Sequence, residues 1–113
     1  MGYMDDFYKN VEQVGVVPVV VLDRVEDAVP LGKALAEGGL PAAEVTFRTA
    51  AAADSIHAIA QECPDVLVGA GTVLNEAQAK RAVDAGARYI VSPGYDMGVG
   101  RWCLAHEVPV IPA

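Results

Sequence analysis

The short apolar run AAEVTF, at residues 42–47, decides the fold class, because four runs of the same kind lie at similar spacing on either side of it. The other runs occupy residues 16–22, 66–70, 89–91 and 108–111. Each run is too short for a typical helix and contains β-branched residues, which predicts a buried strand. Strands that are apolar along most of their length are typical of a parallel sheet covered on both faces.

Helical patterns fill the intervals between the apolar runs. Asp23 followed by Glu26 resembles a capping box at the start of one helix. Pro30 lies about two turns further on, so we expect it to kink or shorten that helix. Further helices are predicted over residues 50–62, between residues 75 and 86, and over residues 96–106, with a lead-in helix over residues 5–13.

Capping residues support two of these helices. Thr49 is predicted to cap the helix over residues 50–62. Asn75, with Gln78 three residues later, is predicted to cap the following helix. Gly86 is expected to end that helix, since glycine favours the position after a helix.

Alternation of strands and helices at this pitch predicts βα units with right-handed crossovers. A doubly wound sheet and a (β/α)8 barrel both fit. A doubly wound nucleotide-binding sheet usually has a glycine-rich turn after its first strand, but residues 20–24 read VVLDR, and GAGT at 69–72 lacks the GxGxxG spacing. We therefore predict an α/β fold, a partial (β/α)8 TIM barrel with a lead-in helix, about four βα units and a fifth strand. Residues 1–113 would form a single domain with one unpaired sheet edge.

Charge and composition restrict the class of partner. The chain has 8 basic and 15 acidic side chains and a formal net charge of -7. This excess of negative charge argues against nucleic acid or an anionic membrane as a partner, but not against an anionic small molecule. The longest apolar runs are about seven residues, well short of the roughly twenty that a membrane-spanning helix needs.

Cysteine and histidine spacing suggest a reduced cytoplasmic protein without a metal site. Cys63 and Cys103 are isolated, and no CxxC pair or secretory leader is recognisable. His57 and His106 lie in predicted helices and form neither HxH nor HExxH, so no metal site is indicated.

Strand alternation separates the side chains of residues 44–48 into two faces. Val45 and Phe47 share one face and suit packing against helices. Glu44, Thr46 and Arg48 share the other, which points inward in a barrel, and Arg48 lies at the carboxyl end where barrel enzymes bind substrates. Glu44 and Arg48 either neutralise each other as an ion pair or serve as a proton-transferring carboxylate beside a guanidinium that binds an anion.

The next two strand ends carry further candidates. Val68, Ala70 and Thr72 share a face by alternation, and the neighbouring glycines allow close backbone approach. Thr72 is either a hydroxyl that contacts a ligand at the rim or simply a loop or capping residue. The sequence SPG at residues 92–94 also lies at the rim, although turn formation alone explains a Pro-Gly pair.

Three motifs together resemble a known family. They are AEVTFRT at residues 43–49, GAGTVL at 69–74 and VSPG at 91–94, and they occur between the apolar segments 16–21 and 108–112. In this order they resemble the amino-terminal part of the 2-keto-3-deoxy-6-phosphogluconate aldolases, also called 2-keto-4-hydroxyglutarate aldolases. The resemblance covers essentially the whole chain.

The resemblance implies a class I aldolase on a (β/α)8 barrel, usually a trimer, with no metal or other cofactor. Such an enzyme cleaves 2-keto-3-deoxy-6-phosphogluconate, or 4-hydroxy-2-oxoglutarate, to pyruvate and an aldehyde. By resemblance, Glu44 is the proton-transferring glutamate and Arg48 binds the carboxylate of the keto acid. Thr72 contacts the substrate, and Pro93 lines its site.

The resemblance also places the Schiff-base lysine on a sixth strand, beyond residue 113. The lysines of this chain are expected on outer helices, at Lys9, Lys33 and Lys80, so we expect the 113 residues alone to be inactive. Two alternatives remain open. One is a non-catalytic half-barrel that acts as an assembly or binding module, and the other is a different phosphate-binding barrel, such as an isomerase.

Overall fold

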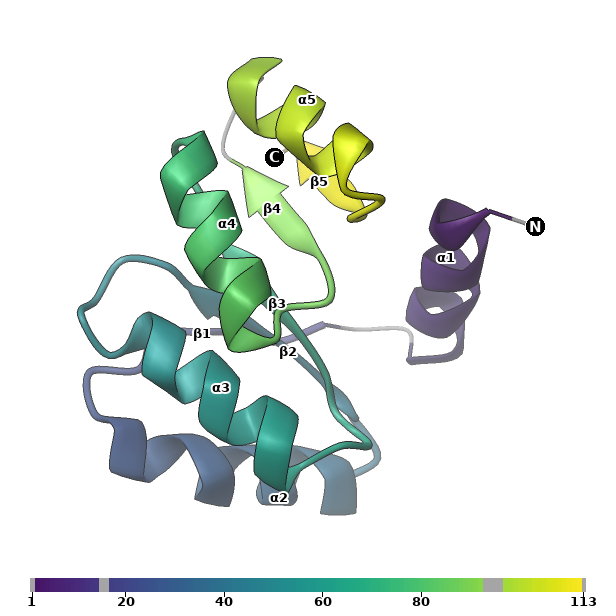
Figure 1. The fold of residues 1–113 in the computed structure, drawn as a ribbon. Helices are drawn as coiled ribbons and strands as arrows, with labels where there is room; N and C mark the ends of the chain where they lie inside the picture. Colours follow the sequence, from purple (N-terminus) through teal and green to yellow (C-terminus); the bar gives the residue numbers. More distant parts are fainter. Residues whose placement is uncertain (1, 15–16, 93–96, 113) are drawn as a thin grey trace.

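Five parallel strands form one sheet in the computed structural model, which describes residues 2–14, 17–92 and 97–112 (Figure 1). The strands are β1 (Val19–Val20), β2 (Ala42–Thr46), β3 (Leu67–Gly71), β4 (Ile90–Ser92) and β5 (Val110–Pro112). Their order in the sheet is β1-β2-β3-β4-β5, the same as in the chain, and every neighbouring pair is parallel. A doubly wound sheet reverses its strand order at one point, so this uninterrupted order is that of a barrel segment.

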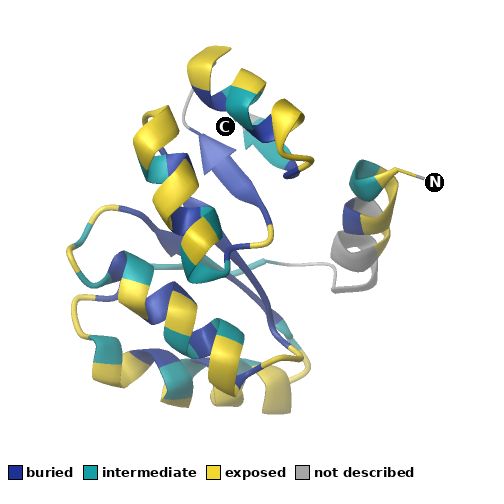
Figure 2. Cartoon of the chain, viewed as in Figure 1, coloured by how far each residue is buried: buried dark blue, intermediate teal, exposed yellow. Residues whose placement is uncertain are grey.

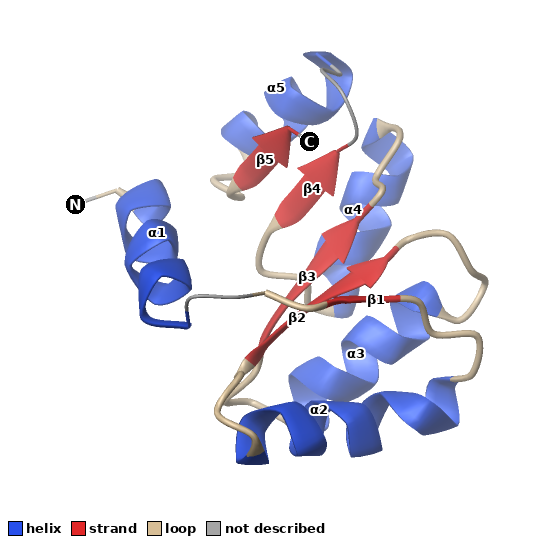
Figure 3. Cartoon of the chain, turned by 180° about the vertical axis from the view of Figure 1, so that it is seen from behind, coloured by secondary structure: helices blue, strands red, loops and turns tan. Residues whose placement is uncertain are grey.

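The helices lie on two sides of this sheet (Figure 3). They are α1 (Tyr3–Val14), the short 3₁₀ helix η1 (Val25–Asp27), α2 (Ala28–Glu37), α3 (Ala52–Glu62), α4 (Glu76–Ala85) and α5 (Met97–Ala105). Helices α2 to α5 pack against one face, as crossover helices of βα units do. Helix α1 lies on the opposite face, where Phe7 packs against the strands.

The main core fills the space between the sheet and α2 to α5. Val45 and Phe47 of the β2 segment meet Ile56 and Ile59 of α3 there, as alternation predicts. Both isoleucines are fully buried, and burial of such a side chain contributes about 1.5–3 kcal/mol. Figure 2 shows the same division, with buried residues on the inner sides of the helices and exposed residues on their outer sides.

The cap of α4 forms as predicted. The Asn75 side-chain oxygen accepts a hydrogen bond from the Gln78 backbone N–H at 2.9 Å. The Gln78 side-chain oxygen in turn accepts from the Leu74 N–H at 2.8 Å, so two donors at the helix start are satisfied. Gly86 ends the helix with φ of 120°, a conformation that favours glycine.

Two predicted caps are wrong. Thr49 does not cap α3, because its hydroxyl donates to the Leu22 carbonyl at 2.6 Å, and α3 begins only at Ala52. Asp23 does not cap α2 either, since η1 intervenes and α2 begins at Ala28. Pro30 consequently lies in the first turn of α2, where its missing N–H is not needed.

Replacement of the α4 cap gives a direct test of this local structure. We expect Asn75→Ala to lower the free energy of unfolding by about 1 kcal/mol, because the Gln78 N–H loses its acceptor. Asn75→Asp retains an acceptor and should differ little from the parent chain. Urea unfolding followed by circular dichroism measures both, and equal loss in the two variants would contradict a capping role.

Candidate functional site

Glu44 and Thr46 of β2 lie on the face of the sheet that is turned away from α2 to α5. Their neighbours Val45 and Phe47 belong to the core under those helices, and alternation turns the intervening side chains the other way. Thr46 is buried and Glu44 is half-buried. A carboxylate on this inner face is the strongest sign of chemistry in the chain, because an ionisable group out of water is unfavourable unless it pairs or serves a function.

Two glycines of β3 make room beside this carboxylate. Gly71 pairs with Thr46 in the parallel register, and a Cβ at Gly71 would overlap the Glu44 carboxylate oxygen Oε2. Gly69 pairs with Glu44 itself, and a Cβ there would overlap the ring of Tyr89. The glycines of the GAG sequence thus permit close approach, as expected, and the side chains that approach are those of Glu44 in β2 and of Tyr89, the residue just before β4.

Burial sets the electrostatics of Glu44. Loss of hydration raises the pKa of its carboxyl above the usual value of 4.5. The described residues contain no ion pair between Glu44 and Arg48, so the self-neutralising pair that the sequence allowed does not form. Arg48 lies exposed, just past the carboxyl end of β2. The carboxylate and the guanidinium therefore remain available for separate roles.

Tyr89 is a site residue that the sequence analysis missed. Its side chain, 2% exposed, lies over Gly69, and its hydroxyl donates to the Ala43 carbonyl at 3.3 Å. Burial, and in second place the charge of Glu44, raises the pKa of this phenol well above its usual value. The sequence signal is an aromatic residue just before the strand that follows the GxG strand, but the apolar run over residues 89–91 explains it equally well as an ordinary core position.

Thr72 follows β3 directly and has φ of +55°. This left-handed conformation is rare for a β-branched residue and marks a position that the surrounding structure holds under strain. Val68 and Ala70 lie in the core under the helices, and β3 ends at Gly71, just before Thr72. Thr72 is half-buried at the carboxyl end of the strand.

Hydrogen bonds join the carboxyl ends of three strands. The Phe47 N–H donates to the Gly71 carbonyl at 2.7 Å, and the Val73 N–H donates to the Val91 carbonyl at 3.1 Å. The buried Ser92 hydroxyl donates to the Val73 carbonyl at 2.9 Å. These bonds form one continuous edge from β2 to β4. Pro93, the fourth predicted site residue, lies outside the described residues.

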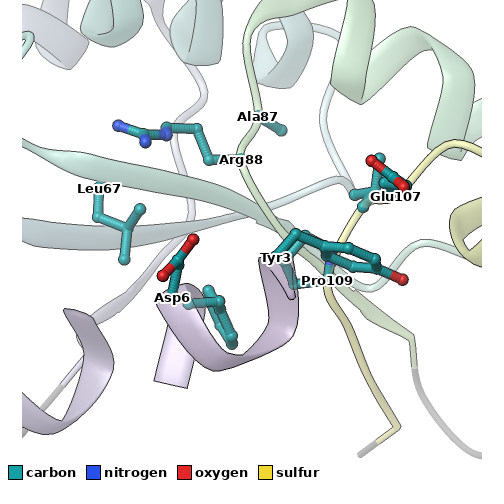
Figure 4. Close-up of a pocket in the computed structure, with 9 residues that line it drawn as sticks. Tyr3, Asp6, Leu67, Ala87, Arg88, Glu107 and Pro109 are labelled. Carbon is teal, nitrogen blue, oxygen red and sulfur yellow. The ribbon is translucent and has the colours of Figure 1, made fainter. Parts of the chain in front are cut away.

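A cavity of about 370 Å³ opens at the other end of the strands (Figure 4). Tyr3 and Asp6 of α1 line one side, and Arg88 and Glu107, which precede β4 and β5, line another. Barrel enzymes bind substrates at the carboxyl ends of their strands, whereas this cavity lies at the amino ends. The edge that carries Glu44 and Thr72 is therefore the better candidate for the functional site.

Other potential reactive groups lie away from this edge. Lys33 and Lys80 are exposed on α2 and α4, on the outer side of the sheet as predicted, and Lys80 pairs with Asp84 at 2.8 Å. Lys9 is exposed on α1, so its predicted place on an outer helix is wrong, because α1 packs on the opposite face. Both cysteines are buried and free, and burial raises the pKa of Cys103 to about 11. In the described part of the chain, no three His, Cys, Asp or Glu residues cluster as metal ligands would, and no helix is long and apolar enough to cross a membrane.

Comparison with known proteins gives the family. The family model described as KDPG and KHG aldolase matches residues 8–113. This chain belongs to that family. The 2-dehydro-3-deoxy-phosphogluconate aldolase of Treponema pallidum is 56% identical over 109 residues, which are 96% of this chain and 52% of the relative. The KHG/KDPG aldolase of Escherichia coli is 46% identical over 97 residues, which are 86% of this chain and 46% of that enzyme.

Solved structures of the family share the fold. The Zymomonas mobilis 2-keto-3-deoxy-6-phosphogluconate aldolase, crystallised with 3-phosphoglycerate, has 38% identity and a TM-score of 0.88 over 96% of this chain and 52% of its own. A Legionella pneumophila KDPG aldolase, with pyruvate captured as a covalent carbinolamine, has 41% identity and a TM-score of 0.80 over 85% and 47%. The prediction of a partial barrel is confirmed, and the isomerase alternative is set aside. The chain spans about half the length of the curated relatives that it matches.

The close approach of Tyr89 to Gly69 predicts that alanine at Gly69 lowers the stability of the chain, whereas alanine at an unobstructed glycine does not. We expect Gly69→Ala to lower the free energy of unfolding by roughly 1–3 kcal/mol or more, because the added methyl overlaps the buried Tyr89 ring. Gly100→Ala is the matched control. Its Cβ meets nothing within 4 Å, and alanine in helix α5 should stabilise the chain by about 0.5–1 kcal/mol. Urea unfolding compares the two, and equal effects would contradict the packing described here.

The raised pKa of Glu44 predicts a stability that depends on pH. A carboxyl whose pKa is higher in the folded chain than in the unfolded one binds more protons when folded, so stability falls as pH rises through the interval above 4.5. Glu44→Gln should therefore raise the urea midpoint at pH 7 and leave it little changed near pH 4. The exposed substitution Glu37→Gln serves as control. A Glu44→Gln variant that is less stable at pH 7 would overturn the assignment.

Proposed function

We propose that residues 1–113 are the amino-terminal part of one barrel domain in a class I aldolase. The reaction is cleavage of a 2-keto-3-deoxy sugar acid phosphate, 2-keto-3-deoxy-6-phosphogluconate, or of 4-hydroxy-2-oxoglutarate, to pyruvate and an aldehyde. The observation that carries the proposal is Glu44, a half-buried carboxylate without an ion-pair partner on the inner face of a sheet that belongs to this family.

Glu44 is the proton-transferring residue in this proposal. Cleavage of the carbon–carbon bond removes a proton from the hydroxyl on the carbon that becomes the aldehyde. The resulting enamine then takes up a proton at the carbon that becomes the methyl group of pyruvate. One carboxyl can serve both steps if its pKa is raised toward neutrality, and burial raises the pKa of Glu44 in that direction. No net proton is gained or lost by the enzyme over the cycle.

The other predicted residues hold the substrate. Arg48 binds the carboxylate of the keto acid, since its guanidinium is exposed at the strand end and suits two parallel hydrogen bonds to a planar anion. Thr72 contacts the substrate from the end of β3, where its strained backbone is a sign of a constrained position. Pro93 lines the site from the segment after β4.

The Schiff-base lysine belongs, in this proposal, to a part of the protein outside residues 1–113. An amine that attacks a keto carbon needs to reach the carboxyl edge of the inner face. Lys33 and Lys80 are exposed on the other side of the sheet, and Lys9 is exposed on α1, which lies toward the amino ends of the strands. A small keto acid is the partner, and nucleic acid and membrane are not. We further propose a trimeric cytoplasmic enzyme that needs no metal.

The alternative function, an assembly or binding module, has one observation in its favour. Val19 and Val21 of the first strand segment are 64% and 52% exposed at the edge of the sheet. Exposed apolar residues on an edge strand call for a covering strand. Further strands of the same barrel would cover these residues equally well. The exposure of Val19 and Val21 is therefore consistent with both the aldolase and the binding-module proposals.

Pyruvate trapping tests the proposed function in the complete protein. Borohydride reduction in the presence of pyruvate should add a reduced pyruvate to one lysine, detected by mass spectrometry. Arg48→Ala should raise the pyruvate concentration for half-maximal trapping about 10- to 100-fold, because a charge-assisted contact is lost. Glu44→Gln should still form the adduct but slow exchange of the pyruvate methyl hydrogens with D2O about 10²- to 10⁴-fold.

Exposed residues provide the controls for this experiment. Arg101→Ala and Glu37→Gln should leave trapping and exchange unchanged, since both side chains lie exposed on helices outside the sheet. A complete protein that forms no adduct would overturn the proposal. An adduct on Lys9, Lys33 or Lys80 would refute the placement of the reactive amine.

A further inference from the structure

Tyr89 occupies the space next to Glu44 in a way that the proposed roles do not use. Glu44 and Gly69 are partners in the parallel register of β2 and β3. The Tyr89 ring lies across Gly69, since a Cβ at that glycine would overlap three ring carbons. The ring and the Glu44 side chain therefore lie on the same inner face of β3, over Gly69 and Gly71 respectively.

The two side chains divide the inner surface of β3 between them. The Glu44 carboxyl lies against Gly71, at the carboxyl end of β3. The Tyr89 ring lies against Gly69, two residues nearer the amino end of the same strand. The ring consequently closes the side of Glu44 that faces the barrel base. With the ring on its base side, the carboxyl lies nearer the rim, where the substrate of a barrel enzyme binds.

Other contacts hold the Tyr89 ring in place. Its hydroxyl donates to the Ala43 carbonyl, on the residue before Glu44, at 3.3 Å. Phe7 of α1 lies on its other side, with ring centroids 5.1 Å apart and the planes tilted by 43°. Leu67 and Val91 complete the same buried cluster. The ring is thus fixed from the lead-in helix on one side and from the Glu44 strand on the other.

We propose that Tyr89, supported by Phe7 of α1, is a positioning residue that holds the Glu44 carboxyl toward the rim and shields it from water on the base side. Tyr89 touches no reacting atom in this arrangement and acts through Glu44. The inference rests on the proposed aldolase function for its consequence in catalysis. It gives α1, which belongs to none of the βα units, a role in the chemistry of the site.

The test separates proton transfer from adduct formation in the complete protein. Tyr89→Leu should leave pyruvate trapping by borohydride within about twofold, because the lysine and Arg48 are untouched. It should slow exchange of the pyruvate methyl hydrogens with D2O about 10- to 100-fold, as expected when a catalytic group shifts by about 1 Å. Tyr89→Phe keeps the ring and should restore exchange to within about threefold of the parent.

A pH profile distinguishes positioning from general packing. The acid limb of the exchange rate reports the pKa of the group that transfers the proton. In Tyr89→Leu this limb should move toward pH 4.5, the usual value for the carboxyl, because water reaches Glu44 from the base side. Phe7→Leu should move it in the same direction by a smaller amount. A purely structural role for Tyr89 predicts lower activity with no shift of the limb.

Each outcome decides between the alternatives. Unchanged exchange in Tyr89→Leu, or a parallel loss of trapping and exchange, would overturn the proposal. If Tyr89→Leu does not fold, Tyr89→Met, which fills much of the same volume with a flexible chain, replaces it. Failure of both to fold would assign Tyr89 to the core alone. Absence of any adduct in the parent protein would instead overturn the aldolase function and leave the contacts of Tyr89 as described.

Discussion

The site depends on one constraint, which is that residues 69 and 71 of β3 are glycines and carry no Cβ. With no Cβ on its inner face at these two positions, β3 is bare backbone there, and a methyl group at either one would overlap a neighbour. Two side chains lie across that bare surface, Glu44 of β2 over Gly71 and Tyr89, just before β4, over Gly69. Ala70, between the glycines, has its side chain in the core under the helices and is fully buried. A single strand thus supports the packing of the core on one face and the placement of the carboxyl on the other.

The two ends of the strands differ in what they offer to a ligand. At the carboxyl ends, hydrogen bonds from Phe47 and Ser92 join β2, β3 and β4 into one edge that is built from backbone groups and short polar side chains. At the amino ends, α1 covers the inner face, and a mixed group of acidic, basic and apolar residues surrounds a cavity (Figure 4). Among the described residues, a non-glycine with positive φ occurs at each end, Thr72 beside the carboxyl edge and Glu107 beside the cavity. Glu107 is exposed, whereas Glu44 near the carboxyl edge is half-buried. We therefore place the proposed chemistry at that edge, and in the same proposal the amino end contributes by fixing the ring beneath the carboxyl.

Sequence patterns predicted the strands and the inner face of β2 because both depend on periodicity over a few residues. They failed where a partner lies far along the chain. Thr49 has the properties of a helix cap, yet its hydroxyl bonds to the Leu22 carbonyl, 27 residues earlier, and no local pattern contains that contact. Alternation likewise gives no guide at Thr72, because the strand ends at Gly71 and the backbone of Thr72 is left-handed. Tyr89 was overlooked because its packing on Gly69 is a property of two strands in register and not of either strand alone.

The separation of Glu44 from Arg48 explains why this chain retains a charge that weakens its folding. An ion pair between them would lower the pKa of the carboxyl, which would make the carboxylate a weaker base and leave less of the protonated acid near neutral pH. It would also occupy the guanidinium that an incoming carboxylate needs. With Arg48 exposed beyond the end of β2 and Glu44 half-buried against Gly71, the two groups keep opposite environments. Hydration keeps the arginine free to bind an anion, whereas burial raises the pKa of the glutamate toward the range useful for proton exchange. The unfavourable burial of one carboxyl is thus the physical basis of the function proposed for it.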